Sequence, residues 1–273
     1  MNRLFVIVCL FFGLWSCQSV QPEPAAKPSP APSPAPVEEK LWSVEELLQD
    51  LPKGQGGQLV QHQFYQLSYR LDAKNAEWAM YRIDSQSVVD ERASRRSGFI
   101  QDPELGGQTA SDADYTGSGF DRGHLIPAED MDFDLKAMEE SFYLSNVSPQ
   151  APSFNRGIWK KLEGDLRDWA LEKGDLLVIT GPVLPAQLPA DAPKIAGDVV
   201  VPTAFYKVIV DLKKRKSIAF LLANEKSDAE LASFALSIRD LEGQSGLNFF
   251  PKLSAKQADE LEEQKELGYW FGE

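Results

Sequence analysis

The chain has two histidines, His62 and His124, so a reaction that needs an imidazole base near neutral pH has two candidates. His62 falls in an alternating, strand-like pattern that favours a structural or surface position. His124 ends the tetrapeptide Asp-Arg-Gly-His at 121–124, where an acid and a cation crowd around a glycine that permits tight turning. The residues favour His124 as a base, although a single histidine in a loop is also an ordinary surface feature.

Two further motifs follow within forty residues. Asn146 begins the pattern Asn-x-x-Pro-Gln, and Asn155 begins the pattern Asn-x-x-x-Trp-x-x-Leu-Glu, which ends at Glu163. Each residue has an ordinary alternative: Asn155 as a helix N-cap, Asn146 as a turn residue, Glu163 as a solvated helix position. The motifs become informative through their order behind residues 121–124.

The elements that must position these residues are read from periodicity and turn signals. Strands are expected at 58–71, 77–83, 142–146, 175–180, 199–211 and 217–223. Helices are expected at 43–49, 133–141, 154–172, 227–239 and 255–267. Residues 85–119 are polar and are expected to form a long loop. Strands cluster in hairpins with helices between them, which predicts an α+β fold with a mainly antiparallel sheet.

The ordered motifs resemble those of the DNA/RNA non-specific endonucleases, a family with secreted bacterial and mitochondrial members. Matching segments at 95–103, 114–115, 180–182, 201–208 and 245–250 extend the resemblance over most of residues 60–250. The resemblance implies the ββα-metal (His-Me finger) nuclease fold, with a mainly antiparallel central sheet flanked by helices. It also implies hydrolysis of phosphodiester bonds in DNA and RNA to 5′-phosphate products with a free 3′-hydroxyl.

The resemblance also assigns roles at the metal. His124 would be the general base that takes a proton from water. Asn155 would be the one direct protein ligand of a single Mg²⁺ ion, with Mn²⁺ as an expected substitute. Glu163 lies eight positions later, a rise of about 12 Å on a helix, so it would hold metal-bound water rather than the ion.

The remaining roles implied by the resemblance concern charge and orientation. Asn146 would orient His124 or the phosphate. Arg122 and one upstream arginine would stabilise the charged transition state. Spacing to Phe99 and Asp102 favours Arg96 as that arginine, with Arg95 as the alternative.

The first 39 residues are expected to lie outside the fold. Arg3 and the apolar run at 4–15 have the size of a signal-peptide core, which predicts a signal peptide at 1–16. The residues ending at Cys17 resemble a bacterial lipobox. They predict a lipid-anchored Pro/Ala/Ser-rich linker at 17–39 and an exported protein on the bacterial cell envelope, periplasmic or surface-exposed. An ordinary cleaved signal peptide is the alternative.

Residues 40–273 are expected to form one endonuclease domain without a transmembrane helix. Cys9 and Cys17 are the only cysteines, so this body has no disulfide or thiolate metal site. The net charge of −13 argues against a DNA-storage protein, which normally relies on a basic surface. The expected partners are DNA and RNA substrates and the membrane, and a homodimer is left open.

Two other functions remain open at this stage. One is a non-catalytic envelope lipoprotein that captures DNA, which would suit the acidic charge and the tether. It predicts a degraded site, whereas His124, Asn155 and Glu163 are all present. The other is a phosphodiesterase for short oligonucleotides.

Overall fold

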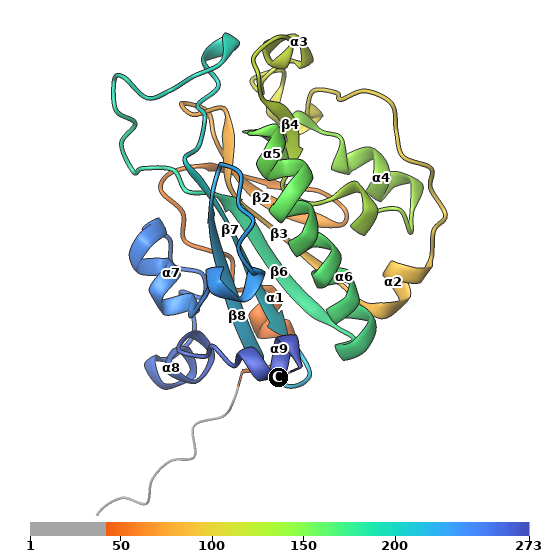
Figure 1. Ribbon diagram of the computed structural model, residues 1–273, viewed down its shortest axis with the longest axis vertical. Helices are drawn as coiled ribbons and strands as arrows, with labels where there is room; N and C mark the ends of the chain where they lie inside the picture. Colours follow the sequence, from red (N-terminus) through yellow and green to blue (C-terminus); the bar gives the residue numbers. More distant parts are fainter. Residues whose placement is uncertain (1–41, 273) are drawn as a thin grey trace, which may run out of the picture. The chain divides into compact units, whose positions relative to one another are not determined.

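A computed structural model describes residues 42–272, which contain a seven-stranded sheet with helices on both faces (Figure 1). The strand order is β1-β2-β3-β6-β7-β8-β9, and every neighbouring pair is antiparallel. Strands β4 and β5 form a separate antiparallel ribbon. The strand bounds are β1 Gln58–Gln61, β2 Tyr65–Arg70, β3 Asn75–Ile83, β4 Asp121–His124, β5 Val147–Gln150, β6 Leu176–Pro182, β7 Ala204–Asp211, β8 Lys216–Ala223 and β9 Ala235–Leu236.

Helices are short except for one that crosses the sheet. The α-helices are α1 Val44–Leu48, α2 Ser85–Val89, α3 Asp112–Tyr115, α4 Leu135–Ser141, α5 Pro152–Phe154, α6 Lys160–Lys173, α7 Ile238–Ser245, α8 Ala255–Glu262 and α9 Leu267–Phe271. Short 3₁₀ turns lie at Pro103–Leu105, Ala128–Asp130, Leu144–Asn146, Ala196–Asp198 and Leu231–Phe234, and a π turn at Asn155–Trp159 joins α5 to α6.

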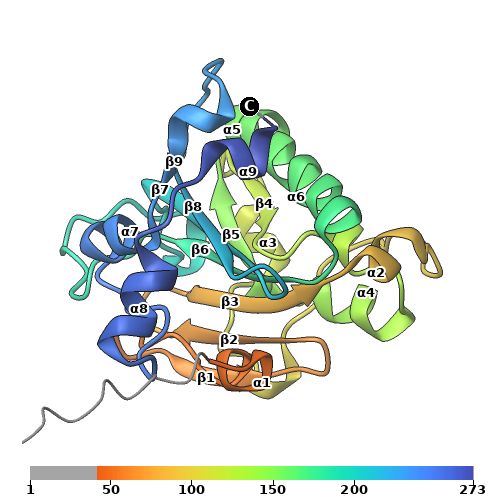
Figure 2. The same ribbon diagram turned by 90° about the horizontal axis from the view of Figure 1, so that it is seen from below.

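Both faces of the sheet are buried. In β3, Trp78 and Met80 point into a layer that contains residues of α1, α7 and α8, whereas Ala79 and Tyr81 point into the layer that contains α6. Figures 1 and 2 show α6 on one side of the sheet and α7 and α8 on the other. Residues on both faces of the central strands are therefore mainly apolar, which explains the nearly continuous apolar runs in the sequence.

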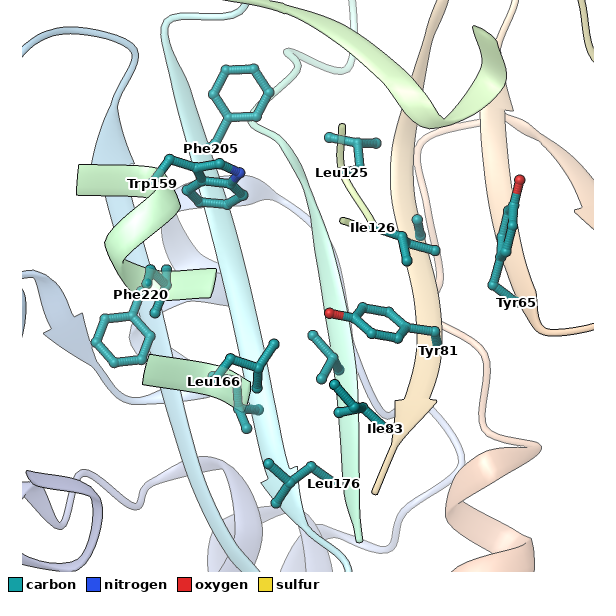
Figure 3. Close-up of a cluster of buried hydrophobic side chains, with 14 of the residues drawn as sticks. Tyr65, Tyr81, Ile83, Leu125, Ile126, Trp159, Leu166, Leu176, Phe205 and Phe220 are labelled. Carbon is teal, nitrogen blue, oxygen red and sulfur yellow. The ribbon is translucent and has the colours of Figure 1, made fainter. Parts of the chain in front are cut away.

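Helix α6 is fixed to the sheet by its apolar side. Leu162, Leu166 and Trp169 are buried in the layer between α6 and the sheet. Trp159, at the end of the π turn, lies beside Phe205 of β7, with ring centroids 5.9 Å apart (Figure 3). This packing sets the rotation of α6 and so determines which of its polar residues face away from the sheet.

The predicted α+β class with a mainly antiparallel sheet is confirmed, and the differences lie in single elements. The expected strand at 58–71 is divided into β1 and β2. The expected strand at 142–146 is wrong, because residues 144–146 form a 3₁₀ turn before β5. The expected helix at 227–239 is also wrong: α7 begins later, where the Ser237 side chain accepts a hydrogen bond from the backbone N–H of Asp240.

The predicted signal peptide at 1–16 and linker at 17–39 lie outside the described residues. Within residues 42–272, none of the helices combines the length and the apolar character that crossing a bilayer requires.

Candidate active site

The ribbon of β4 and β5 presents His124. Asp121 pairs with Gln150, Gly123 with Ser148 and His124 with Val147. A side chain at position 123 would place its Cβ 2.2 Å from the Cδ of Gln150, so this position accepts only glycine without a shift of that buried amide. Close packing in the ribbon therefore requires the glycine of Asp-Arg-Gly-His. His124 is the next residue along β4.

His124 lies between two aromatic rings. Its ring centroid is 5.0 Å from that of Phe99 and 5.0 Å from that of Phe142, and the residue is 9% exposed. Within the described part of the chain, its Nε2 has no hydrogen-bond partner. Burial lowers the pKa of His124 to about 3, and the positive charge of Arg95 acts in the same direction. The imidazole is therefore neutral at neutral pH, which is the protonation state that a general base requires.

The depressed pKa makes a prediction for the free protein. A histidine that ionises at about pH 6.5 when unfolded and about pH 3 when folded contributes stability above the unfolded pKa. That contribution is lost as pH falls from 6.5 towards 3. In an NMR titration of the two histidines, assigned with a His62→Gln variant, we expect the His124 ring to remain neutral at pH 5. A midpoint near 6.5, the ordinary pKa of histidine, would contradict the burial argument.

Asn155 is oriented by a carboxylate from the ribbon. Its Nδ2 donates to Oδ2 of Asp121 at 2.9 Å, which leaves the amide oxygen as the free end of the side chain. Arg156 donates to both carboxylate oxygens of the same aspartate, at 2.8 and 2.5 Å. Burial raises the pKa of Asp121, but the hydrogen bonds from Arg156 and Asn155 outweigh it, and the pKa is lowered. An ionised Asp121 therefore joins β4 to the π turn that leads into α6.

The polar side of α6 supplies three more groups. Lys160, Glu163 and Arg167 follow one another at spacings of three and four, so they share one face of the helix. Arg167 donates to Asp130 at 2.9 Å, and the hydroxyl of Tyr81 donates to the other oxygen of that carboxylate at 2.7 Å. Burial raises the pKa of Glu163, and the buried cation Lys207 of β7 opposes that shift.

These groups line one cavity of about 590 Å³. Ten residues form its wall: Arg95, Arg122, His124, Pro127, Glu129, Asn155, Arg156, Lys160, Glu163 and Arg167. The cavity therefore brings together a neutral imidazole, an oriented amide, the half-buried carboxyl group of Glu163, the exposed carboxyl group of Glu129 and five basic side chains. Such a wall suits a phosphodiester beside a hydrated cation.

Four of the residues predicted from the sequence meet at this cavity: Arg122, His124, Asn155 and Glu163. Arg96 does not; its place in the wall is taken by Arg95, whose guanidinium also lies 5.4 Å from the ring centroid of Phe142. The preference for Arg96 is thus corrected in favour of the adjacent arginine. Spacing alone did not separate the two because both fall in an irregular, exposed segment.

Two roles were expected for Asn146, orienting His124 or orienting the phosphate, and its position favours the first. It is fully buried, and its amide donates to the carbonyl oxygens of Ile126 and Ser141 at 3.0 and 2.9 Å. Its Oδ1 accepts from the backbone N–H of Ile126 at 3.0 Å. Asn146 therefore holds the backbone that follows His124 and positions the base without reaching the cavity.

Sequence reasoning assigned no role to Glu129, Arg156, Lys160 or Arg167. The signal for two of them was available, because Lys160 and Arg167 lie three and four positions from Glu163 and must share its helix face. Glu129 and Arg156 carried no such periodic signal.

The chain is similar to known nucleases along most of its length. The sequence model of the family described as DNA/RNA non-specific endonuclease matches residues 44–256. Nuclease C1 of Cunninghamella echinulata var. echinulata is 36% identical over 232 residues, which cover 80% of this chain and 92% of the relative. The mitochondrial nuclease EXOG of Homo sapiens is 35% identical over 205 residues, which cover 68% of this chain and 55% of the relative.

A solved structure agrees with these sequence matches. The crystal structure of the EndoG/EndoGI complex contains a chain that is 30% identical, with a TM-score of 0.66. The match covers 73% of this chain and 88% of that chain. The ββα-metal fold predicted from the motifs is therefore confirmed.

The predicted bacterial envelope location is wrong on this comparison. Relatives that carry a compartment in their names, from Homo sapiens and Saccharomyces cerevisiae among others, are mitochondrial nucleases. The prediction rested only on the apolar run at 4–15 and on Cys17, which resemble targeting signals. Cys17 and its expected lipid lie outside the described residues.

The relatives are named as nucleases rather than as DNA-capturing proteins, which disfavours a non-catalytic role. The motifs, the fold and the matched relatives agree: the chain is a nuclease that acts on DNA and RNA, and it belongs to the DNA/RNA non-specific endonuclease family.

Proposed function

We propose that this nuclease is a metal-dependent endonuclease that leaves 5′-phosphate and 3′-hydroxyl ends. One observation carries the proposal: a buried imidazole that is neutral at neutral pH lines the same cavity as an oriented amide and several arginines. A phosphodiester in this cavity would meet a base on one side and positive charge on the others.

The donor set fits a hard cation held by few protein ligands. Asn155 offers an amide oxygen, since its nitrogen is bound to Asp121, and Glu163 lies in the same wall. Within residues 42–272, no group of three or more His, Cys, Asp or Glu side chains is arranged to hold a metal. These features favour Mg²⁺, with Mn²⁺ as a substitute, held by Asn155 and by waters that Glu163 orients. When bound, the ion would neutralise phosphate charge and stabilise the leaving oxygen.

The chain's own groups would then act as follows. His124 removes a proton from water as the water oxygen forms a bond to phosphorus. The bond from phosphorus to the 3′ oxygen breaks, and that oxygen takes up a proton from solvent. Arg95 and Arg122 stabilise the extra negative charge of the pentacovalent state.

We expect the enzyme to cut nucleic acids of any base sequence because of what the cavity contacts. A cavity that binds phosphate and metal reads the backbone, which carries no base information. Association of two copies stays a prediction and is not required by this mechanism, because every residue in it belongs to one chain.

The test is cleavage of labelled linear and circular DNA, single strands and RNA by the purified protein in Mg²⁺. We expect closed circles to be cut and all long substrates to be shortened, with 5′-phosphate ends detected by a 5′-phosphate-dependent exonuclease. Cleavage of dinucleotides at a rate similar to that of long strands would favour the short-substrate phosphodiesterase instead. Products with 3′-phosphate ends would refute the proposed polarity.

A further inference from the structure

Every arginine in the cavity wall is paired with a carboxylate. Arg95 contacts Glu129 at 2.7 Å, Arg122 contacts Asp112 at 2.6 Å, and Arg167 contacts Asp130 at 2.9 Å. Arg156 is paired with Asp121 at 2.5 Å. The pairing means that each guanidinium which could bind phosphate has a competing anion in the free protein.

Glu129 differs from the other three carboxylates in one respect. It lines the cavity itself, whereas Asp112, Asp121 and Asp130 do not. The side chains of Asp121 and Asp130 are only 15% and 0% exposed, and they hold their arginines in place. The Asp112 side chain is 55% exposed but lies outside the cavity wall. The Glu129 side chain is 55% exposed and its partner Arg95 is 52% exposed, so solvent reaches both ends of this pair.

An exposed pair of this kind can open at little cost. Ion pairs at protein surfaces contribute roughly 0–1 kcal/mol, so a substrate phosphate can displace the carboxylate. Burial would raise the pKa of Glu129, but its own backbone N–H and the charge of Arg95 lower it overall, so the carboxylate is ionised when it competes.

Resting on the proposed function, we propose that Glu129 is an affinity-determining residue for the nucleic-acid backbone. In the free enzyme the Glu129 carboxylate forms an ion pair with Arg95. Substrate phosphate must displace this carboxylate to bind the Arg95 guanidinium. When cleavage leaves a 5′-phosphate, the carboxylate returns to Arg95 and promotes release. Glu129 therefore weakens both substrate and product binding through one specific arginine.

The test is a double-mutant cycle of binding constants. A fluorescein-labelled single-stranded oligonucleotide is titrated with His124→Ala protein in Mg²⁺ at low salt, and gels confirm that the strand stays intact. In this background Glu129→Gln is expected to tighten binding about three- to tenfold, and Arg95→Gln to weaken it. Adding Glu129→Gln to Arg95→Gln is expected to restore less than about twofold, because the carboxylate would have no arginine to occupy.

Two matched controls separate this pairing from a general change of charge. Arg96→Gln removes the neighbouring arginine, and Glu129→Gln should keep its full effect beside it. Glu139→Gln removes an exposed carboxylate that pairs with Lys136 at 3.5 Å outside the cavity wall, and binding should be unchanged.

Three results would overturn the proposal. They are unchanged binding in Glu129→Gln, an equal gain with and without Arg95, and an equal gain in Glu139→Gln. Strand cleavage by the His124→Ala protein would instead count against the role of the base, and it would be visible on the gels independently of the binding constants.

Discussion

Replacing His124 with alanine is expected to slow phosphodiester cleavage by about 10²- to 10⁴-fold, the usual contribution of a general base. Binding of DNA should change little, because the arginines of the wall and the amide of Asn155 remain. The imidazole is already neutral near pH 7, so its loss removes a proton acceptor and no charge. Single-turnover cleavage of a labelled duplex, with binding measured by anisotropy, separates the two effects.

The matched control is the other histidine. The ring of His62 contacts Asp102 at 2.9 Å, and Ser145 donates to the same carboxylate oxygen, so this cluster ties β1 to the segments at 102 and 145. His62→Gln should lower the melting temperature and leave the rate of the folded enzyme within about threefold. Equal losses of rate in the two variants would indicate that His124 acts through folding rather than through chemistry.

Removal of the metal should lower the cleavage rate about as strongly as His124→Ala does. We expect EDTA to stop cleavage and Mg²⁺ or Mn²⁺ to restore it, since the proposed ion would neutralise phosphate charge and stabilise the leaving oxygen. In Asn155→Ala the amide oxygen is lost, and the Mg²⁺ concentration for half-maximal rate should rise by at least about tenfold, with a lower maximum. A titration of rate against free Mg²⁺ measures both quantities.

Asp121→Asn is the informative companion variant. Asn155 keeps its oxygen there but loses the charged acceptor that orients it, and Arg156 loses its partner. The metal dependence should therefore shift in the same direction as in Asn155→Ala and by a smaller factor. An unchanged Mg²⁺ requirement in Asn155→Ala would exclude this residue as the ligand, even if the overall rate fell.

Local patterns predicted the strands of the sheet and the long helix well, because these elements repeat apolar residues at a regular period. They failed at 142–146 and at 227–239. In the first segment all five residues are buried, and the last three of them, Leu144–Asn146, form a 3₁₀ turn that the sequence does not distinguish from a strand. In the second, β9 pairs with β8 through Ala219 and Phe220, and such a pairing overrides local helix propensity.

The residues of the site also differ in this way, because some positions are set by local features and others by long-range contacts. The motif order identified His124, Asn155 and Glu163, since each is tied to a local feature of the ribbon or the helix. The choice between Arg95 and Arg96 depends instead on how an irregular segment is anchored: the backbone N–H of Ile100 donates to the carbonyl of Phe142 at 3.1 Å. A contact between positions so far apart leaves no trace in the spacing of the arginines.

The positions of the wall residues along the sequence affect how the enzyme folds and how it tolerates substitutions. Nine of its ten residues come from the contiguous segment 122–167, and only Arg95 is supplied from elsewhere. Contacts within this segment close shorter loops than the pairing of the distant strands does, so they cost less chain entropy. The wall residues therefore form a mostly local unit that the sheet supports. Substitutions in the outer strands should alter how long the enzyme stays folded more than they alter its turnover rate.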